Sequence, residues 1–422
     1  VLIKSKRPTS VFPAVILPTI WRYLQTLEAA PYFLGLVLSA FSLSGLLTGP
    51  LFGYWSDQSG ATKKIILFAN CFEMIGNFMY FMGYSKWLLL SSRLVAGIGT
   101  GAGSSIFAFA AVMACRQAGL LIGPAFNIFL RLCDFNVGPF VVNKYTAPGL
   151  FMCLMWTLLQ VAVILMYWDL PPLEKGKARQ SLTGQRREEG NDQGVVEEEE
   201  DDGDEEKPLM ASQEFLREEV VVLLAAQFIT LFNQTALETM VTPMTQRYFS
   251  YGELENSVMY CLCGVEVIAG FLFVRWLSQR VADRVVLAIG LTICNISGVW
   301  CLVFLANPLG QFPWQLTEFI IGVFLQVLGL PFVAVAQVSL FSKITSEKTQ
   351  GFSQGVRRSV GGLATILGPL WAGGLTENMY IMLGMMMALL ALLTVCKRNL
   401  EDRECVYIQI VAPRTTVAEP MQ

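Results

Sequence analysis

Long hydrophobic runs separated by short polar breaks extend along most of this sequence of 422 residues. The runs fall into two groups of six, at roughly 10–27, 32–55, 65–83, 88–109, 111–130 and 148–168, and at roughly 220–244, 255–277, 285–306, 316–341, 352–375 and 379–396. Runs of about 20 apolar residues are long enough to cross a bilayer as helices, which satisfy their own backbone hydrogen bonds. A transmembrane barrel would show short segments of alternating hydrophobicity, and the sequence has none. The pattern therefore predicts an all-α membrane protein.

Charged stretches divide the predicted helices into two bundles. We expect an N-terminal six-helix bundle over 1–168, a charged linker over 169–219, a C-terminal six-helix bundle over 220–396 and a polar tail over 397–422. The linker is basic in its first part and strongly acidic in its second part. Such blocks of like charge are typical of solvated, disordered segments.

Basic residues gather at one end of the predicted helices. Outside the linker they are Lys63, Lys64, Arg275, Arg280, Arg284, Lys343, Lys348, Lys397 and Arg398. Because basic residues mark the cytosolic ends of membrane helices, we expect the linker and the tail to lie in the cytosol. The chain is thus predicted to be a multi-pass integral membrane protein whose first partner is the lipid bilayer.

The two groups of helices repeat one another. The motif Pro-x-x-x-Arg-Tyr at residues 18–23 recurs at residues 243–248, an offset of 225 positions. Gly97 and Gly322 are also 225 positions apart. The repeat predicts two halves that share one plan and are related by pseudo-two-fold symmetry.

A third marker departs from this offset. The Gly-Pro pairs that begin at Gly123 and Gly368 are 245 positions apart, so the first half lacks 20 residues between Gly97 and Gly123. We expect the end of the fourth helix, its turn and the start of the fifth helix to be missing. The first helix is expected to be truncated as well, because only 17 residues precede Pro18 and three of them are charged.

Composition narrows the possible chemistry. The chain is 54% hydrophobic and 15% charged, whereas soluble domains average about a quarter charged residues. It contains no His, which excludes His-based metal sites and proton relays and leaves proton transfer to carboxylates. Its ten Cys lie mostly in apolar runs, where Cys acts as a small hydrophobic residue. We expect neither enzymatic activity nor a metal, cofactor or nucleic-acid partner, since the sequence shows no nucleophile–base pair, phosphate loop or metal cluster.

The polar break after the second predicted helix carries a motif. It contains Gly53, Asp57 and Gly60, followed by Lys63 and Lys64. The segment resembles the signature cytosolic loop of the major facilitator superfamily, in which glycines allow a tight turn and the Asp accepts hydrogen bonds that latch the cytosolic gate. Ala follows the second Gly, where an Arg is usual. The alternative is an ordinary polar turn between two membrane helices.

The fourth predicted helix contains Arg93 followed by a run with two glycines, Gly97 and Gly99. This resembles the Arg-plus-glycine element of the same superfamily. An Arg within a membrane span usually faces the interior of the bundle. Arg93 lies only about six residues into the predicted span, so a second placement, with its side chain extended to the membrane interface, is also open.

The fifth and eleventh predicted helices share a Gly-Pro element. It comprises Gly119, Gly123 and Pro124 in the fifth helix and Gly368 and Pro369 in the eleventh. Small residues four positions apart let helices approach closely, and Pro bends a span. This element also resembles one of the superfamily, so the resemblance covers most of the chain. It implies two six-helix bundles around a central cavity that opens alternately to either side.

Within the superfamily, the chain is most similar to a lysosomal branch. The similarity rests on residues 237–243, 264–266 and 366–369, and residues 117–124 fit it as well. It implies residence in the endosome or lysosome membrane and chloride permeation. Tyr407 and Ile410 of the tail resemble a tyrosine sorting signal, which makes clathrin adaptors an expected partner.

Carboxylates inside the predicted spans are the candidate mechanistic residues. Glu73, Glu238 and Glu266 lie within the third, seventh and eighth helices. Ionisable residues inside a membrane are costly, and they usually serve a function. We therefore expect these three residues, together with Arg93, to take part in proton coupling or substrate binding. Alternatively, each Glu is a protonated or hydrogen-bonded structural residue.

Three functions remain open. The first is secondary transport of a small solute or ion by alternating access, with proton coupling through buried carboxylates. The second is an endolysosomal chloride-permeable channel, which the resemblance alone implies. The third is a truncated or mis-spliced product that does not transport, which the missing 20 residues suggest. The sequence does not identify the substrate, because cavity side chains vary freely on one fold.

Overall fold

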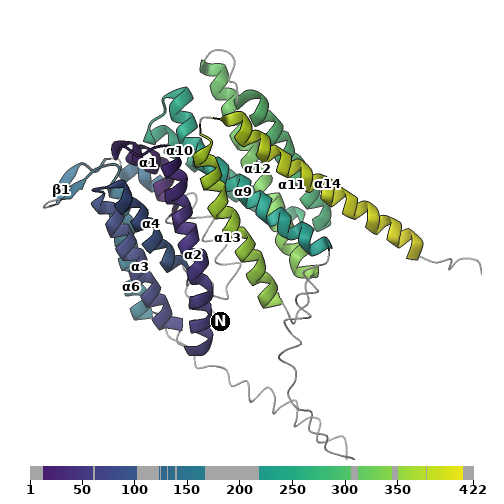
Figure 1. Ribbon diagram of the computed structural model, residues 1–422, viewed down its shortest axis with the longest axis horizontal. Helices are drawn as coiled ribbons and strands as arrows, with labels where there is room; N and C mark the ends of the chain where they lie inside the picture. The colour runs from purple at the N-terminus through teal and green to yellow at the C-terminus, as the bar shows by residue number, and fades with distance from the viewer. Residues whose placement is uncertain are drawn as a thin grey trace, which may run out of the picture.

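Helices make up nearly all of the described chain. The computed structural model describes residues 13–59, 62–101, 123, 125–130, 132–137, 140–166, 218–305, 312–344, 350–376 and 378–411. The helices of the first half are α1 (Pro13–Thr26), α2 (Tyr32–Ser59), α3 (Thr62–Met82), α4 (Lys86–Thr100) and α6 (Ala147–Met166). Those of the second half are α9 (Glu218–Phe249), α10 (Glu253–Leu277), α11 (Asp283–Trp300) with the π-helical turn Cys301–Leu305, α12 (Phe312–Ile344), α13 (Gln350–Gly374) and α14 (Met379–Val411). The predicted helical protein is confirmed (Figure 1).

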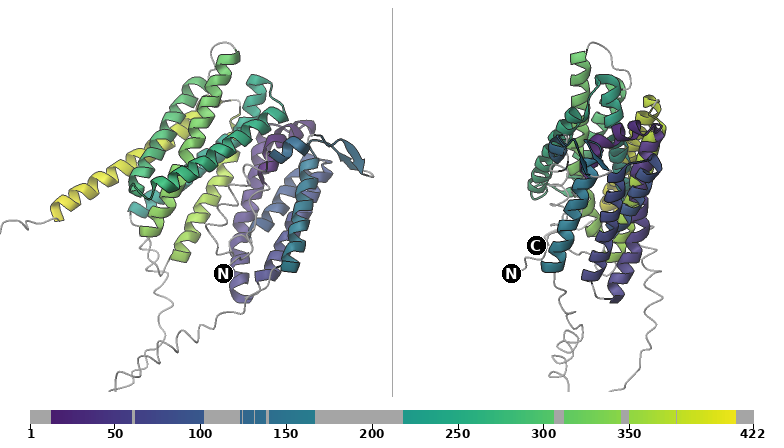
Figure 2. Two further views of the ribbon diagram at one scale, coloured as in Figure 1. Left: turned by 180° about the vertical axis from the view of Figure 1, so that it is seen from behind. Right: turned by 90° about the vertical axis from the view of Figure 1, so that its left-hand side faces the viewer.

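These helices form two bundles that stand side by side. Figure 1 shows α2, α3, α4 and α6 together in one bundle and α9, α11, α12 and α14 in the other. The left view in Figure 2, seen from behind, shows the same division. Helix α13 packs along both α9 and α2. It therefore lies where the two bundles meet and forms much of the surface between them.

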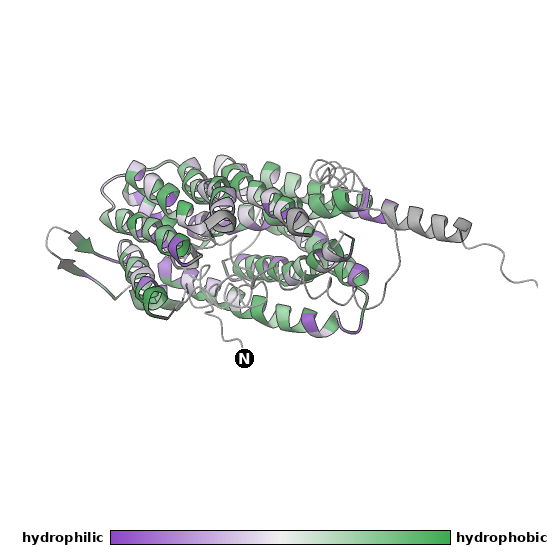
Figure 3. Cartoon of the chain, turned by 90° about the horizontal axis from the view of Figure 1, so that it is seen from below, coloured by the Kyte–Doolittle hydropathy of each residue, from purple (hydrophilic) through white to green (hydrophobic). Residues whose placement is uncertain are grey.

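The outer faces of both bundles are apolar. Within the described residues, eight helices are long and hydrophobic enough to cross a membrane. Large side chains point outward from them: Leu158 of α6 is 63% exposed and Leu272 of α10 is 65% exposed. Figure 3 shows hydrophobic residues over most of the helices and hydrophilic residues in isolated patches. Such a surface suits contact with lipid tails, as expected for a multi-pass membrane protein.

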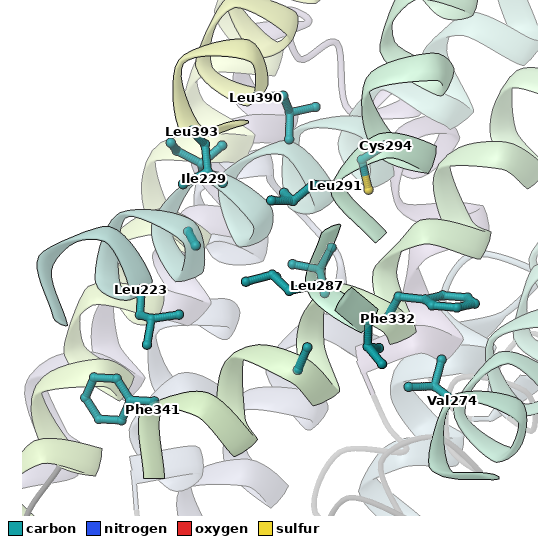
Figure 4. Packing of buried hydrophobic residues seen from close by; sticks show 14 of the residues in the cluster. Leu223, Ile229, Val274, Leu287, Leu291, Cys294, Phe332, Phe341, Leu390 and Leu393 are labelled. Carbon is teal, nitrogen blue, oxygen red and sulfur yellow. The ribbon is translucent and has the colours of Figure 1, made fainter. Parts of the chain in front are cut away.

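A buried cluster joins five helices of the C-terminal bundle (Figure 4). It includes Leu223 of α9, Val274 of α10, Leu291 of α11, Phe332 of α12 and Leu390 of α14. Lipid tails are as apolar as leucine, so burying these side chains inside a bilayer brings no hydrophobic gain. The contacts therefore stabilise the bundle through van der Waals packing. The cluster holds the five helices together and so fixes the walls of the cavity described below.

The two ends of the bundles differ in structure. At one end, β1 (Phe135–Val137) pairs with β2 (Phe140–Val142) in a short antiparallel hairpin. We call this the hairpin end, and we call the opposite end, where α2 connects to α3 and α10 to α11, the loop end. The wholly helical prediction missed the hairpin. Aromatic and β-branched residues on both sides of a Gly-Pro pair are a strand signal that the sequence does contain.

Equivalent positions of the sequence repeat meet in space. Trp21 of α1 and Gln246 of α9 are 225 positions apart, and the Trp21 indole nitrogen donates a hydrogen bond to the Gln246 side-chain oxygen. Equivalent residues are expected to meet at the axis of a two-fold arrangement. The pseudo-two-fold axis therefore passes between α1 and α9 near the hairpin end.

The predicted helix boundaries need one notable correction. Helix α14 ends at Val411, whereas the last apolar run was predicted to end at residue 396. Beyond the run, Lys397 precedes Glu401 by four positions, and Arg398 precedes Asp402 by four. Opposite charges at this spacing stabilise a helix without a membrane around it. The first part of the predicted polar tail is therefore helical.

The predicted defects of the first bundle stay predictions. The 20 missing residues are expected within 102–122, and this segment lies outside the described residues. The chain before Pro13 lies outside them as well. Residues 125–130 are helical and form the end of the predicted fifth helix.

Candidate transport cavity

A cavity of about 550 Å³ lies in the C-terminal bundle between α9, α10 and α12. Its described wall also includes Leu17 of α1, Cys301 of the π-helical turn and Arg357 of α13. Most of the lining is apolar. Small-molecule sites in proteins are typically apolar cavities of about 300–1,000 Å³ with a few polar groups. The size and lining therefore suit a small organic molecule.

One face of α9 supplies several polar residues of this wall. Gln227, Gln234 and Glu238 all line the cavity, at spacings of seven and four that place residues on one helix face. The Gln234 side-chain nitrogen donates to a Glu238 carboxylate oxygen at 2.8 Å. The hydroxyl of Tyr260 on α10 donates to the Glu238 backbone carbonyl at 3.1 Å. These two bonds hold the Glu238 carboxylate at the cavity wall.

Arg357 brings a positive charge to the same wall. Its residue is 7% exposed, and its Nη1 donates to the Gln227 side-chain oxygen at 3.2 Å. Gln227 and Glu238 are eleven positions apart on α9. At 1.5 Å per helical residue, this separates the level of Arg357 from that of Glu238 by about 16 Å. The cation lies toward the loop end and the carboxylate toward the hairpin end.

Glu266 takes a different position from Glu238. Cys263, Gly264 and Val267 of α10 line the cavity, whereas Glu266 does not. One carboxylate oxygen of Glu266 is buried and has no hydrogen-bond partner among the described residues. The structure thus brings one of the two predicted carboxylates of this bundle to the cavity.

The predicted charges of the N-terminal bundle form a separate cluster. Arg93 is 4% exposed, and its Nη2 donates to the Asn77 side-chain oxygen at 3.0 Å. The Asn77 side-chain nitrogen donates to the Glu73 backbone carbonyl at 2.8 Å and lies 3.4 Å from a Glu73 carboxylate oxygen. The Arg93 guanidinium also lies 4.9 Å from the centre of the Tyr80 ring. Of the two placements open for Arg93, the structure therefore shows the buried one.

Glycines allow the helices around this cluster to approach closely. A Cβ on Gly97 would meet the Phe41 backbone of α2, and a Cβ on Gly99 would meet the Glu73 side chain of α3. The two glycines that follow Arg93 in sequence thus have a packing role on both sides of α4.

Ionic contacts join the two bundles at the hairpin end. Arg22 of α1 donates to the Tyr251 backbone carbonyl at 2.7 Å and lies 4.0 Å from a Glu253 carboxylate oxygen. Lys144, after β2, lies 3.2 Å from the same Glu253 oxygen. Burial alone would lower the pKa of the Lys144 ammonium, but its contacts with Tyr145 and Glu253 raise this pKa above its ordinary value. Glu253 of the C-terminal bundle thus holds two cations of the N-terminal bundle.

Close backbone contact between α2 and α13 continues this interface. A Cβ on Gly35 would overlap the Pro369 carbonyl oxygen. Ser39 of α2 donates to the Ile366 backbone carbonyl at 2.6 Å. Nearer the middle of the two helices, Gly362 packs against a side chain of α2. The bundles are therefore in direct contact from the hairpin end to about the middle of α2 and α13.

Comparison with known families identifies this architecture. The family model of the Major Facilitator Superfamily matches residues 9–313 and 223–404. The chain belongs to the Major Facilitator Superfamily. The resemblance inferred from the sequence motifs is confirmed.

Two curated relatives show how far the similarity extends. Major facilitator superfamily domain-containing protein 8 of Xenopus laevis is 23% identical over 442 residues, which covers 86% of this chain and 82% of that protein. An SPX domain-containing membrane protein of Arabidopsis thaliana is 25% identical over 200 residues, covering 42% of this chain and 28% of that protein. The first similarity spans both halves of the chain.

Solved structures of superfamily members share the fold. A D-xylose-proton symporter superposes with a TM-score of 0.66 at 14% identity, over 92% of this chain and 94% of that chain. A bacterial homolog to the human lysosomal transporter Spinster, in an inward-facing and unoccupied conformation, superposes with a TM-score of 0.65 at 15% identity, over 93% of this chain and 94% of that chain. At these identities the likeness establishes the two-bundle fold.

The superfamily loop motif lies at the loop end. Helix α2 continues through Gly53 and Asp57 to residue 59, and Gly60 lies outside the described residues. Lys63 of α3 donates to a backbone carbonyl of α6 at 3.0 Å, and Lys64 is exposed. The first part of the motif is therefore helical, and the turn expected at its second glycine lies outside the described residues.

The second half carries the diverged counterpart of this motif. Asp283, the first residue of α11, accepts a hydrogen bond from Ser339 of α12 at 2.6 Å and is bonded to Lys343 of the same helix. The acidic residue thus ties α11 to α12 within the C-terminal bundle.

The remaining motif residues have mixed placements. Gly368 packs against α9, where a Cβ would meet the Phe232 backbone, so the Gly-Pro element of α13 lies between α9 and α2. In the first half, Gly123 is buried, while Gly119 and Pro124 lie outside the described residues. Tyr407 and Ile410 lie within the last part of α14.

The sequence analysis missed several residues of the cavity and the interface. Arg357 is the main omission. It lies within a predicted span, and an Arg within a membrane span usually faces the interior of the bundle, as argued for Arg93. Gln227 and Gln234 could have been found from their position on the same helix face as Glu238. Glu253 and Lys144 carry no sequence signal, since their pairing depends on how the two bundles meet.

Proposed function

We propose that this chain is a secondary transporter that moves a small solute through the cavity of the C-terminal bundle by alternating access. The observation that carries this proposal is the apolar cavity of about 550 Å³ with Glu238 and Arg357 in its wall. Membership of the superfamily supports transport rather than catalysis. An apolar cavity with few, well-placed polar groups binds a solute without holding it irreversibly.

The conformation described here fits one state of such a cycle, in which the two bundles are closed at the hairpin end. Glu253, Gln246 and the glycine contacts of α2 and α13 close the bundles together at the hairpin end. These contacts must separate for the cavity to open at that end, because the bundles meet directly there. Rocking of one bundle against the other provides that motion.

Glu238 is our choice for a proton-coupling residue. It lies on the cavity wall, its carboxylate is held by Gln234, and a transported solute would pass beside it. Glu266, also predicted to couple, lies off the wall, and Glu73 and Arg93 are engaged with each other through Asn77. Proton binding would neutralise Glu238 in an apolar cavity. The conformational change would then not have to carry an unfavourable charge in apolar surroundings.

Uptake into proteoliposomes under an inward proton gradient tests this choice. With a panel of small solutes, the normal chain should show gradient-driven uptake, and Glu238→Gln should reduce the gradient-driven part at least about tenfold. Glu266→Gln is the matched control and should retain most of the gradient-driven uptake. Loss of coupling in Glu266→Gln with normal coupling in Glu238→Gln would show that the wrong carboxylate was chosen.

We further propose that the loop end faces the cytosol and that the protein resides in the endosome or lysosome membrane. The clustered basic residues support the orientation, and the similarity to Major facilitator superfamily domain-containing protein 8 supports the proposed branch. An epitope inserted into residues 169–217 should be accessible in cells permeabilised only at the plasma membrane. Tyr407→Ala should shift the protein to the cell surface if clathrin adaptors read Tyr407 and Ile410.

A chloride-permeable channel is the second candidate function. The buried cation Arg357 in the cavity wall is the observation that favours an anion. Patch-clamp recording of enlarged endolysosomes distinguishes the two functions. A chloride-selective current that does not saturate would favour the channel, whereas electrically silent, saturable flux would favour the transporter.

The third possibility, a chain that does not transport, concerns the predicted loss within residues 102–122. Comparing the coding transcript with its genomic locus tests the cause. An intact reading frame without the 20 residues would rule out a splicing or annotation artefact.

A further inference from the structure

We propose that the cavity selects an organic anion with an apolar body, whose carboxylate or other acidic group binds Arg357. The proposal rests on the transport function above and narrows its substrate class. It combines three features of the cavity: the one cation among its described lining residues, the distance of this cation from Glu238, and the apolar lining.

Arg357 is placed to hold an anionic group. Among the described residues that line the cavity, Arg357 and Glu238 are the charged ones, so Arg357 is the cation of this wall. Its Nη1 donates to the Gln227 side-chain oxygen, which fixes the guanidinium at the cavity wall. A guanidinium presents five donors in a planar fork that matches a carboxylate with two parallel hydrogen bonds. In an apolar surrounding this attraction is stronger than it is in water.

The position of Arg357 along the cavity leaves room for the rest of the solute. Arg357 lies at the level of Gln227, and Glu238 lies about 16 Å farther along α9. An acidic group at Arg357 is therefore well separated from the carboxylate of Glu238. Repulsion between the two negative charges falls with this distance.

The surface between the two charges suits an apolar body. Leu231 and Leu237, which lie between Gln227 and Glu238 on α9, line the cavity, and Phe271 of α10 adds an aromatic ring to its wall. Binding apolar surface here is favourable by about 25 cal/mol per Å² removed from water. A small inorganic anion would meet Arg357 but would leave this lining unused.

Equilibrium dialysis with the purified full chain in nanodiscs tests the proposal. The probes are naphthoate, the neutral amide naphthamide and the cation naphthylmethylammonium, which share one aromatic body. Naphthoate should bind at least about tenfold more tightly than naphthamide, as expected for charge-assisted hydrogen bonds. The cation should bind most weakly.

Variants of two neighbouring arginines identify the site. Arg357→Gln should abolish the preference for naphthoate over naphthamide, while Arg357→Lys should retain part of it because the charge remains. Arg358→Gln is the matched control, since Arg358 is the next residue on α13, is exposed and does not line the cavity. It should leave the preference unchanged.

Three results would overturn the proposal. They are an unchanged preference in Arg357→Gln, tighter binding of the cation than of naphthoate, and complete displacement of naphthoate by an equal concentration of chloride. The last result would assign the site to chloride instead. Binding at equilibrium does not depend on transport, so a failed flux assay with normal naphthoate selectivity would overturn the transport function and leave the anion site standing.

Discussion

The two bundles share one plan but use their buried charges differently. In the N-terminal bundle, Glu73 and Arg93 are linked through Asn77 and are enclosed between α3 and α4. In the C-terminal bundle, Glu238 and Arg357 are separate and both line a cavity. Buried charges that engage each other hold helices in register, whereas charges in the wall of a cavity lie where a solute would pass. The two copies of one plan thus differ in whether their described buried charges face a neighbouring helix or a cavity.

The repeat-equivalent positions Arg93 and Glu318 mark this divergence. Both are buried, at 4% and 6% exposure. One carboxylate oxygen of Glu318 has no hydrogen-bond partner among the described residues, while Trp300 donates to the Glu318 backbone carbonyl at 2.9 Å. The same place in the fold therefore carries opposite charges in different surroundings.

The largest expected effect follows from breaking the charge cluster of the N-terminal bundle. Arg93→Ala should lower the free energy of unfolding by about 3 kcal/mol, because it removes a large buried side chain and leaves the buried Asn77 side-chain oxygen without its donor. Glu238→Gln in the other bundle should change it by less than about 1 kcal/mol, since its side chain faces the cavity. Thermal unfolding of the purified proteins measures both.

A second substitution checks the cause of this loss. Glu73→Gln combined with Arg93→Gln removes both charges and should recover part of the stability lost in Arg93→Ala. Arg358→Ala on the exposed side of α13 should cost less than about 0.5 kcal/mol. If Arg93→Ala is no more harmful than Arg358→Ala, the cluster does not hold the N-terminal bundle.

The next effect concerns the surface where the two bundles meet. Gly35→Ala should destabilise the protein by about 1–3 kcal/mol, because its Cβ would overlap the Pro369 carbonyl oxygen. Gly374→Ala is the control, since a Cβ there would meet no atom within 4 Å. Thermal unfolding compares the two, and equal stability would mean that α2 and α13 do not need this close contact.

A smaller effect is expected for the ionic contacts at the hairpin end. Glu253→Gln weakens the attachment of Arg22 and Lys144 and should favour separation of the bundles about fivefold, which corresponds to ~1 kcal/mol. Hydrogen exchange of backbone amides in residues 246–256 should accelerate by the same factor. Glu28→Gln changes an exposed carboxylate at the same end and should leave exchange there unaltered. Equal exchange in both variants would show that Glu253 does not close the interface.

The smallest effect is expected at the loop end of the C-terminal bundle. Asp283→Asn should reduce stability by less than about 1 kcal/mol, because the side chain of its partner Lys343 is 67% exposed and water already screens the pair. The difference should shrink further at high salt. A salt-independent loss would instead indicate that the hydrogen bond from Ser339 carries the contact.

Much of the fold could be predicted from the sequence, because membrane helices follow directly from apolar runs. Arg93 shows where this reasoning stops. Its burial depends on contacts with Asn77 and Glu73 of another helix, and the sequence does not show which residues of different helices meet. The extension of α14 was missed because hydropathy was the guide, and the helix continues past the apolar run to Val411.

The candidate site was predictable only in part. Glu238 was found because an acidic residue in an apolar run is conspicuous, and Arg357 could have been found by the same argument. Whether Glu238 or Glu266 reaches the cavity depends on the rotation of α9 and α10 against α12, which packing decides. The pairing of Glu253 with Arg22 and Lys144 depends on the contact between bundles and leaves no local pattern.

The rate of naphthoate uptake into proteoliposomes, measured against naphthoate concentration, tests the central claim most directly. If the C-terminal bundle binds the solute and the bundles then rock, the rate should saturate, because each cycle moves one bound solute. Arg357→Gln should raise the concentration at half-maximal rate at least about tenfold. A rate that rises linearly without saturation, or that is the same in Arg357→Gln, would contradict the account.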